Sequence, residues 1–195
     1  MNNNISINEL MSLEEYAKNR SEFREGILQH KKYRSLQIGN AVTLFFEDRR
    51  TIHYQIQEML RIEKIFEEEG IREELSSYNP LIPNGDNWKA TMMIQYTDPQ
   101  ERQIALSKMV GIEDCVWVKA GDNKLIYAVA DEDLDRTRED KTSSVHFLRF
   151  QIDPDILDEI NENTPIAFGI DHKHYDTNTG DIERKLKISI MNDLD

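Results

Sequence analysis

The sequence predicts an α+β fold, with a mainly antiparallel sheet of about six or seven strands and a long helix and several shorter helices packed on it. Helical spacing of apolar residues dominates the first part of the chain, whereas period-two alternation, typical of half-buried strands, dominates after residue 87. No linker rich in Ser, Gly or Pro interrupts the 195 residues. We therefore expect a single α+β domain over residues 1–195.

The first elements are predicted to be a helix and two short strands. Ser12-Leu13-Glu14-Glu15 forms a capping box, in which the serine and the glutamate three residues later satisfy each other's free amides. The apolar spacing then changes from about four to two between residues 36 and 46. Gly39-Asn40 can turn the chain between the two strands.

The longest helical pattern covers residues 50–76, which contain no proline and many good helix formers. Gly70 either breaks this helix into two pieces or is tolerated inside it. A loop follows at residues 78–87, because two prolines and Asn84-Gly85 favour turns.

Strands dominate the second half of the chain. Residues 88–96 alternate as a half-buried antiparallel strand does. Asp98-Pro99 and Asp153-Pro154 each open a short helix, because proline is tolerated at the first helical position. The remaining predicted strands are a hairpin within 116–130, a central strand at 145–152, and a final pair at 166–175 and 185–191.

The charge and the composition exclude several kinds of partner. The chain has 24 Lys and Arg against 37 Asp and Glu, a net charge of −13, so its surface repels a phosphate backbone and we expect no nucleic-acid binding. No apolar run approaches the ~20 residues that span a bilayer, and the start lacks the features of a secretory signal. The single cysteine, Cys115, excludes an internal disulfide. We expect an acidic cytoplasmic protein with no membrane association.

The motifs of common enzyme classes are absent from the sequence. It has no glycine-rich phosphate loop, no Gly-x-Ser-x-Gly and no His-Glu-x-x-His. Cys115 lies beside Glu113 and Asp114, which raise a thiol pKa and disfavour a nucleophilic role. The sequence therefore assigns no catalytic residue and leaves open whether the protein is an enzyme.

A carboxylate on the long helix is the first candidate for a functional role. Glu63 falls among Ile52, Ile56 and Phe66 at helical spacing, and Gln55 lies at the margin of this apolar face. A buried charge must be paired, hydrogen-bonded or protonated. Glu63 is therefore predicted either to form a structural ion pair with an arginine or to act as a ligand or acid–base group in a pocket.

The run Glu47-Asp48-Arg49-Arg50, at a junction between a strand and a helix, is the second candidate. Acidic side chains at this place cap the helix amides and complement the helix dipole. The functional alternative is that an aspartate and an arginine project into a cleft at the end of the strand.

Three histidines complete the candidates. His172 and His174 share a face if their strand continues, and two imidazoles spaced in this way can hold a metal ion together with a nearby carboxylate. An exposed strand end is the alternative for this pair. His146, on a predicted buried strand, is either a hydrogen-bonded core residue or a metal ligand or proton carrier.

Seven blocks of the chain carry a resemblance to a family: His30-Lys31-Lys32, Phe46-Glu47-Asp48-Arg49, Tyr54-Gln55-Ile56-Gln57-Glu58-Met59-Leu60-Arg61-Ile62-Glu63, Tyr78-Asn79-Pro80-Leu81-Ile82-Pro83, Trp88-Lys89-Ala90-Thr91, Lys141-Thr142-Ser143-Ser144-Val145-His146-Phe147-Leu148-Arg149-Phe150 and Gly169-Ile170-Asp171-His172. From about residue 10 to residue 172, the chain resembles an uncharacterised bacterial family, a domain of unknown function. The matching blocks include Glu47, Asp48, Arg49, Gln55, Glu63, His146 and His172, whereas His174 lies beyond them.

The resemblance implies that the gene lies beside genes for rubrerythrin-like proteins and iron–sulfur oxidoreductases. We therefore expect a soluble accessory or binding protein linked to iron, redox or peroxide-stress partners. The alternative is a metal-dependent redox protein or an enzyme, with a polar pocket between the long helix and the sheet. The candidate pocket residues are Glu47, Asp48, Arg49, Gln55, Glu63 and His146.

Overall fold

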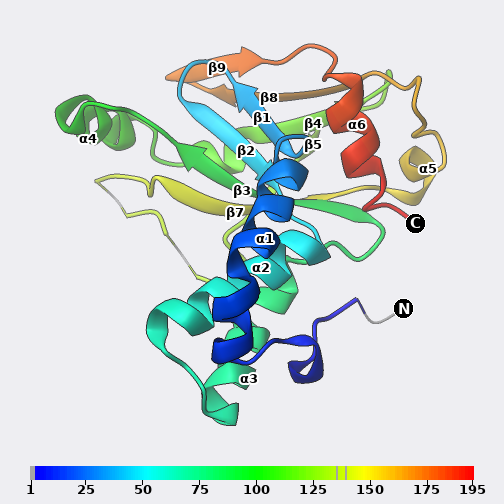
Figure 1. Ribbon diagram of the computed structural model, residues 1–195. Coiled ribbons are helices and arrows are strands. Elements are labelled where there is room, and N and C mark those ends of the chain that lie inside the picture. Colours follow the sequence, from blue (N-terminus) through cyan, green and yellow to red (C-terminus); the bar gives the residue numbers. More distant parts are fainter. Residues whose placement is uncertain (1–2, 135, 139) are drawn as a thin grey trace.

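The computed structural model describes residues 3–134, 136–138 and 140–195 (Figure 1). The described residues form an α+β fold with two antiparallel sheets, a five-stranded sheet in the order β1-β2-β3-β7-β6 and a four-stranded sheet in the order β5-β4-β8-β9. The predicted class is thus confirmed, but two sheets replace the expected single sheet. The strands are β1 (Ser35–Ile38), β2 (Val42–Phe46), β3 (Asn87–Ile94), β4 (Val116–Ala120), β5 (Ile126–Tyr127), β6 (Val129–Ala130), β7 (Val145–Gln151), β8 (Ile166–His172) and β9 (Tyr175–Asn178).

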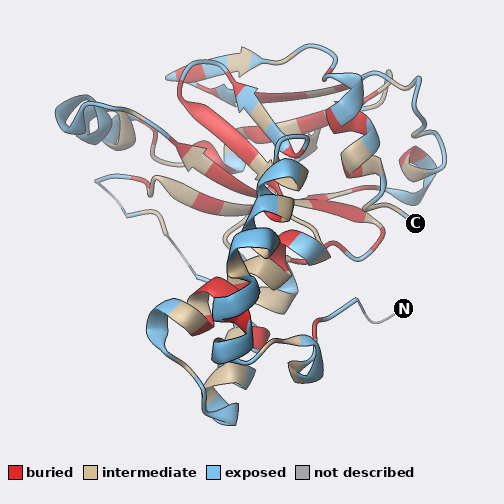
Figure 2. Ribbon diagram, in the orientation of Figure 1, coloured by how far each residue is buried: buried red, intermediate tan, exposed pale blue. Residues whose placement is uncertain are grey.

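The main hydrophobic core lies between the two sheets. The ring of Phe168 on β8 contacts the rings of Phe46, Trp88 and Phe150 on the other sheet, with centroids 5.2 to 6.0 Å apart. Helix α6 (Arg184–Met191) adds Ile190 to this core, and its carbonyl accepts a hydrogen bond from the Trp88 indole at 2.9 Å. Figure 2 shows the buried residues along the strands and mostly exposed residues on α1 and α4.

The two sheets are joined along both sides. On one side the chain passes from β5 to β6 through Ala128, so Tyr127 pairs with the four-stranded sheet and Val129 pairs with the five-stranded sheet. On the other side the Tyr175 hydroxyl donates to the Ile38 carbonyl at 2.7 Å and accepts from the Ala41 amide at 2.9 Å. These links fix the separation of the sheets and leave the outer face of the five-stranded sheet to the helices.

Helices α1 (Leu13–Lys31), α2 (Arg49–Glu63) and α3 (Glu68–Tyr78) gather on one side of the five-stranded sheet (Figure 1). They share a second hydrophobic cluster, to which α2 contributes Ile52, Ile56 and Leu60. Ser12 caps α1 by accepting the Glu15 amide at 3.2 Å, which confirms the predicted start of that helix. The other helical elements are η1 (Ile7–Glu9), η2 (Asn79–Leu81), α4 (Pro99–Lys108), η3 (Ile112–Cys115) and α5 (Pro154–Leu157).

The predicted long helix is two helices, and they separate before Gly70. Helix α2 ends at Glu63, where Lys64 takes a left-handed φ of 56°, and Gly70 lies inside α3. Phe66 therefore does not continue the apolar face, and it is 71% exposed. Glu63 is exposed as well, so the prediction that its carboxylate faces the core is wrong. The buried face of α2 follows Ile52, Ile56 and Leu60, and it turns away from Glu63 before the helix ends.

The last predicted strand is a helix. Strand β8 pairs with β9 through a turn at Lys173 and His174, and residues 184–191 form α6. Leu186, Ile188 and Ile190 alternate as a strand would, but only Leu186 and Ile190 are buried, and Ile188 is 38% exposed. Two buried residues four positions apart lie on the same face of a helix, and in α6 this face packs on the core between the sheets.

Candidate functional site

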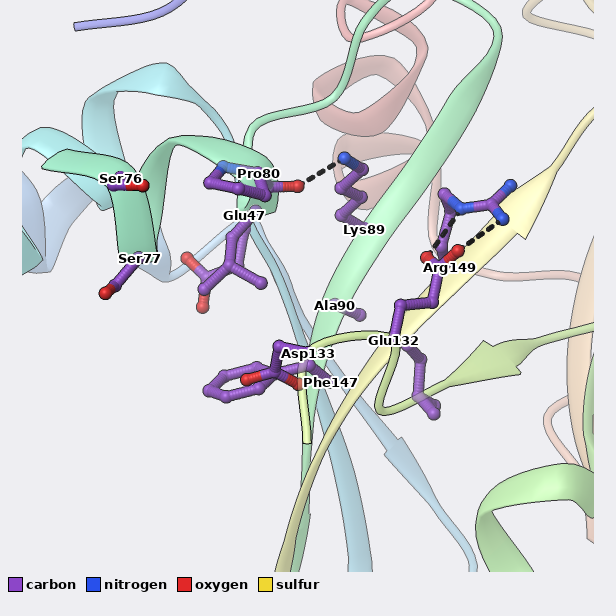
Figure 3. A pocket seen from close by; sticks show the side chains of 12 residues that line it. Glu47, Ser76, Ser77, Pro80, Lys89, Ala90, Glu132, Asp133, Phe147 and Arg149 are labelled. Carbon is purple, nitrogen blue, oxygen red and sulfur yellow. Dashed lines mark hydrogen bonds and ion pairs between the residues drawn. The ribbon is translucent and has the colours of Figure 1, made fainter. Parts of the chain in front are cut away.

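Two adjoining pockets lie on the outer face of the five-stranded sheet, under α2, α3 and η2. Their volumes are about 280 and 330 Å³, and they share Glu47, Leu81 and Phe147 as lining residues. We refer to the two pockets together as the Glu47 groove. Figure 3 shows the smaller pocket. The alternative prediction of a pocket between a long helix and the sheet therefore has a counterpart in the structure.

The floor of the groove consists of cross-strand rows from β2, β3 and β7. Phe45, Thr91 and Phe147 form one row, because Phe45 pairs with Thr91 and Thr91 pairs with Phe147. The next row along contains Lys89 and Arg149, which are direct partners, and Glu47, whose amide donates to the Lys89 carbonyl at 2.8 Å. The period of two in each strand places all these side chains on the outer face.

Glu47 lies where the two pockets meet. Its carboxylate accepts hydrogen bonds from the hydroxyl of Thr51 on α2, at 2.5 Å, and from the hydroxyl of Thr91 on β3, at 2.7 Å. A helix and a strand therefore hold the group in one orientation. Gln55, another predicted pocket residue, lines the larger pocket from the next turn of α2.

Two cations lie beside Glu47 at the smaller pocket. The Lys89 ammonium donates to the carbonyl of Pro80, and burial together with the facing Arg149 guanidinium lowers the pKa of Lys89. Arg149 forms a two-pronged ion pair with Glu132, with both N–O distances 2.8 Å. Figure 3 shows Lys89 turned toward Pro80 and Arg149 turned toward Glu132.

His146 is a core residue that does not reach the Glu47 groove. It neighbours Phe147 on β7, so it points to the opposite face of the sheet, where it is fully buried. Its Nδ1 lies 2.6 Å from an Asp131 carboxylate oxygen, and its Nε2 lies 2.8 Å from the Thr142 hydroxyl. Of the two interpretations that the sequence left open, this geometry fits the hydrogen-bonded core histidine.

Asp48 and Arg49 line a different cavity, a polar cleft of about 690 Å³ between the end of α1, the start of α2 and the C-terminal residues. Asp48 caps α2, since its Oδ1 accepts the Thr51 amide at 2.8 Å, while its Oδ2 lies 2.5 Å from His30 Nε2. Burial raises the pKa of Asp48, but Arg34, the Thr51 amide and His30 outweigh it, and the net pKa is lowered. Asp48 therefore has both predicted roles, as a helix cap and as a cleft residue.

Sequence reasoning missed His30 and Arg34. Arg34 is 2% exposed, and its guanidinium donates to the Phe46 carbonyl at the end of β2, at 3.1 Å, and to Asp193, at 2.6 Å, so it ties β2 to the C-terminal end of the chain. The block His30-Lys31-Lys32 belongs to the resemblance, but it gave no role to His30 or Arg34. Partners so far apart in the sequence leave no local pattern.

His172 and His174, the predicted metal pair, are not arranged as expected, because both ring nitrogens of His172 have hydrogen-bond partners. Its Nε2 lies 3.2 Å from the Val110 carbonyl, and its Nδ1 accepts the His174 amide at 3.3 Å. His174 lies in the turn after β8 instead of on the strand. In the part of the chain that the structure describes, no group of three or more His, Cys, Asp or Glu residues is arranged to hold a metal ion.

A protein-family model described as "Protein of unknown function (DUF3501)" matches residues 4–194. The chain belongs to this family. The family model supports the resemblance inferred from the sequence blocks, and it covers all the lining residues of both pockets of the Glu47 groove.

The DUF3501 chain is also similar to a solved structure, described as a novel protein of unknown function from Burkholderia pseudomallei K96243. The two share 44% sequence identity over 98% of this chain and 99% of the other, with a TM-score of 0.93. No curated protein matches the chain. No helix among the described residues combines the length and apolar character needed to cross a bilayer.

Proposed function

We propose that this protein is a cytoplasmic binding protein whose small amphipathic ligand occupies the Glu47 groove. The observation that carries the proposal is the junction of two largely apolar pockets at one oriented carboxylate. Ligand sites typically combine apolar walls with a few placed polar groups. Phe147 and Leu81 provide apolar surface to both pockets, while Glu47, Gln55 and Lys89 provide the polar groups.

The proposal includes an accessory role with a redox or iron-handling partner of the rubrerythrin-like or iron–sulfur oxidoreductase type. This part rests on the family resemblance and on the gene neighbourhood that it implies. Size-exclusion chromatography of the purified chain mixed with such a partner tests it directly. Co-elution that depends on ligand in the groove is expected, whereas separate elution with and without ligand would contradict the accessory role.

The binding role is tested with a fluorescent apolar dye and a variant that fills the smaller pocket. Ser76→Trp places an indole at its wall, where Ser76 is exposed and outside both hydrophobic clusters. Ser107→Trp on α4 is the matched control, because Ser107 is an exposed helical serine outside the groove. We expect dye binding to the wild type and the control, and at least a tenfold loss in Ser76→Trp. Equal binding to all three proteins would remove the groove as the ligand site.

A second candidate, an enzyme or a metal-dependent redox protein, is favoured by the His30–Asp48 contact in the polar cleft. A carboxylate that orients an imidazole leaves the other ring nitrogen for a proton or a metal ion. His30 Nδ1 makes no hydrogen bond within the described residues, and the side chain is 24% exposed. Stoichiometric iron, manganese or zinc in the purified protein that is lost in His30→Gln would replace the binding proposal with this one.

A further inference from the structure

The row Glu47, Lys89 and Arg149 contains an unusual arrangement of charges. Lys89 and Arg149 are direct cross-strand partners on β3 and β7, and like charges in this position are destabilising. Glu132 neutralises Arg149 through two hydrogen bonds. Lys89 keeps its charge beside an apolar pocket.

Neither Glu47 nor Lys89 lies in an ion pair within the described part of the chain, although their strands place them side by side. Glu47 is held by the hydroxyls of Thr51 and Thr91, and Lys89 is held by the carbonyl of Pro80. These hydrogen-bond partners are neutral, so neither the Glu47 carboxylate nor the Lys89 ammonium is in a direct ion pair, and Glu132 and Asp86 act on Lys89 only from a longer distance. Burial and the Arg149 guanidinium lower the pKa of Lys89, and the more distant Glu132 and Asp86 carboxylates offset this only in part.

Both groups have unused hydrogen-bonding capacity. An ammonium has three donors, and Lys89 gives one to Pro80. A carboxylate has about four acceptor positions, and Glu47 uses two. The remaining donors suit an anionic oxygen and the remaining acceptors suit a cationic N–H group. A ligand that satisfies both must carry opposite charges close together.

The rest of the pocket selects for size and polarity. Its volume is about 280 Å³, and Pro80, Leu81 and Phe147 line it. This is at the lower end of the ~300–1,000 Å³ range of ligand sites, so it fits a small molecule with one apolar group. A free α-amino acid with an apolar side chain has this size and these charges.

We propose that the Glu47 groove recognises an apolar α-amino acid, with its carboxylate at Lys89 and its ammonium at Glu47. This inference rests on the proposed binding function and names the ligand class for the same site. The apolar side chain lies along Phe147 and Leu81, toward the place where the two pockets join. No bond is made or broken in this role.

Three matched compounds test the inference by isothermal titration calorimetry on the full chain. L-phenylalanine carries both charges, 3-phenylpropionate lacks the ammonium, and 2-phenylethylamine lacks the carboxylate. We expect L-phenylalanine to bind tightest and each analogue to bind about tenfold or more weakly, since each loses charge-assisted hydrogen bonds.

Two variants assign the charges to their residues. Lys89→Gln should reduce the affinity for L-phenylalanine to that for 2-phenylethylamine, and the affinity for 2-phenylethylamine should not change. Glu47→Gln should reduce the affinity for L-phenylalanine to that for 3-phenylpropionate, and the affinity for 3-phenylpropionate should not change. Lys124→Gln is the control, because Lys124 lies outside both pockets, with its side chain 72% exposed. Circular dichroism checks that each variant folds. If Glu47→Gln does not fold, Lys89→Gln alone decides.

The outcomes separate the two proposals. Equal binding of the three compounds, or no binding of any while the dye still distinguishes Ser76→Trp, overturns the amino-acid inference and leaves the binding function standing. If Ser76→Trp does not change dye binding, the binding function is wrong, and so is the amino-acid inference that rests on it. Both proposals are supported if L-phenylalanine binds tightest and if Lys89→Gln removes its advantage over 2-phenylethylamine.

Discussion

Replacing Glu58 by glutamine is expected to weaken the packing of α1 on α2 by roughly 3 kcal/mol at pH 7. The Glu58 carboxylate accepts hydrogen bonds from the Arg20 guanidinium at 2.7 and 2.9 Å and from the Tyr16 hydroxyl at 2.7 Å. Arg61 adds a contact of 3.1 Å from the same helix. With a side chain only 12% exposed, Glu58 has the paired, buried position that the sequence suggested for Glu63.

The magnitude follows from the protonation equilibrium. Hydrogen bonds from Arg20 lead the interactions that outweigh burial and lower the pKa of Glu58 from 4.5 to about 2. At ~1.36 kcal/mol per pH unit, this difference corresponds to roughly 3 kcal/mol of stability from the ionised form. Glutamine has the shape of the protonated acid, so it should lose about this amount. Because the folded pKa is the lower one, the contribution is complete above pH 4.5 and disappears as the pH falls toward 2.

Urea denaturation between pH 2 and pH 7 measures the effect. The wild type should lose roughly 3 kcal/mol more than Glu58→Gln as the pH is lowered through this window. Glu63→Gln is the matched control on the same helix, and because Glu63 is exposed, it should stay within about 0.5 kcal/mol of the wild type. If Glu58→Gln has the same stability and pH dependence as the wild type, the proposed role of the Glu58 cluster is wrong.

The remaining predictions concern other parts of the fold. Burial raises the pKa of Asp193 from 3.8 to about 6 despite the adjacent Arg34. The contribution of Asp193 to stability should therefore decline as the pH rises from 3.8 to about 6. In urea denaturation, the free energy of unfolding of Asp193→Asn should change less with pH over this range than that of the wild type. Gly169→Ala should destabilise the protein by ~1–3 kcal/mol in thermal denaturation, because the added Cβ would lie 2.2 Å from the Trp117 ring, and an unchanged melting temperature would contradict this. Asp131 has a φ of 48°, which glycine adopts without strain. We nevertheless expect Asp131→Gly to lose about 2 kcal/mol of stability in urea denaturation, because His146 loses its carboxylate partner. A gain in stability would refute this. We also expect residues 1–195 to unfold in one calorimetric transition, and two separate transitions in the ligand-free protein would indicate more than one domain.

Local patterns in the sequence were sufficient to predict helix starts and tight turns, because neighbouring residues determine them. The caps at Ser12 and Asp48 and the proline starts of α4 and α5 are in the predicted places, because a helix end is satisfied by residues within one turn. Gly39, with a φ of 65°, makes the predicted turn between β1 and β2. Local patterns also proposed Glu47, from its position at the junction of a strand and a helix, and Gln55, from its position at the margin of an apolar helix face, and both residues line the groove.

Only the tertiary structure determined which elements pack against each buried face of a strand or helix. Period-two alternation is the same in both sheets, so it could not assign the strands to two sheets, and it allowed α6 to be interpreted as a strand. Glu58 is the buried carboxylate instead of Glu63 because Arg20 and Tyr16 reach it from α1. Hydrophobic burial is non-directional, so a periodic pattern shows that a face is buried without showing what covers it. The pairing of Glu47 with two hydroxyls, of His30 with Asp48 and of Lys89 with Pro80 therefore depended on the folded chain.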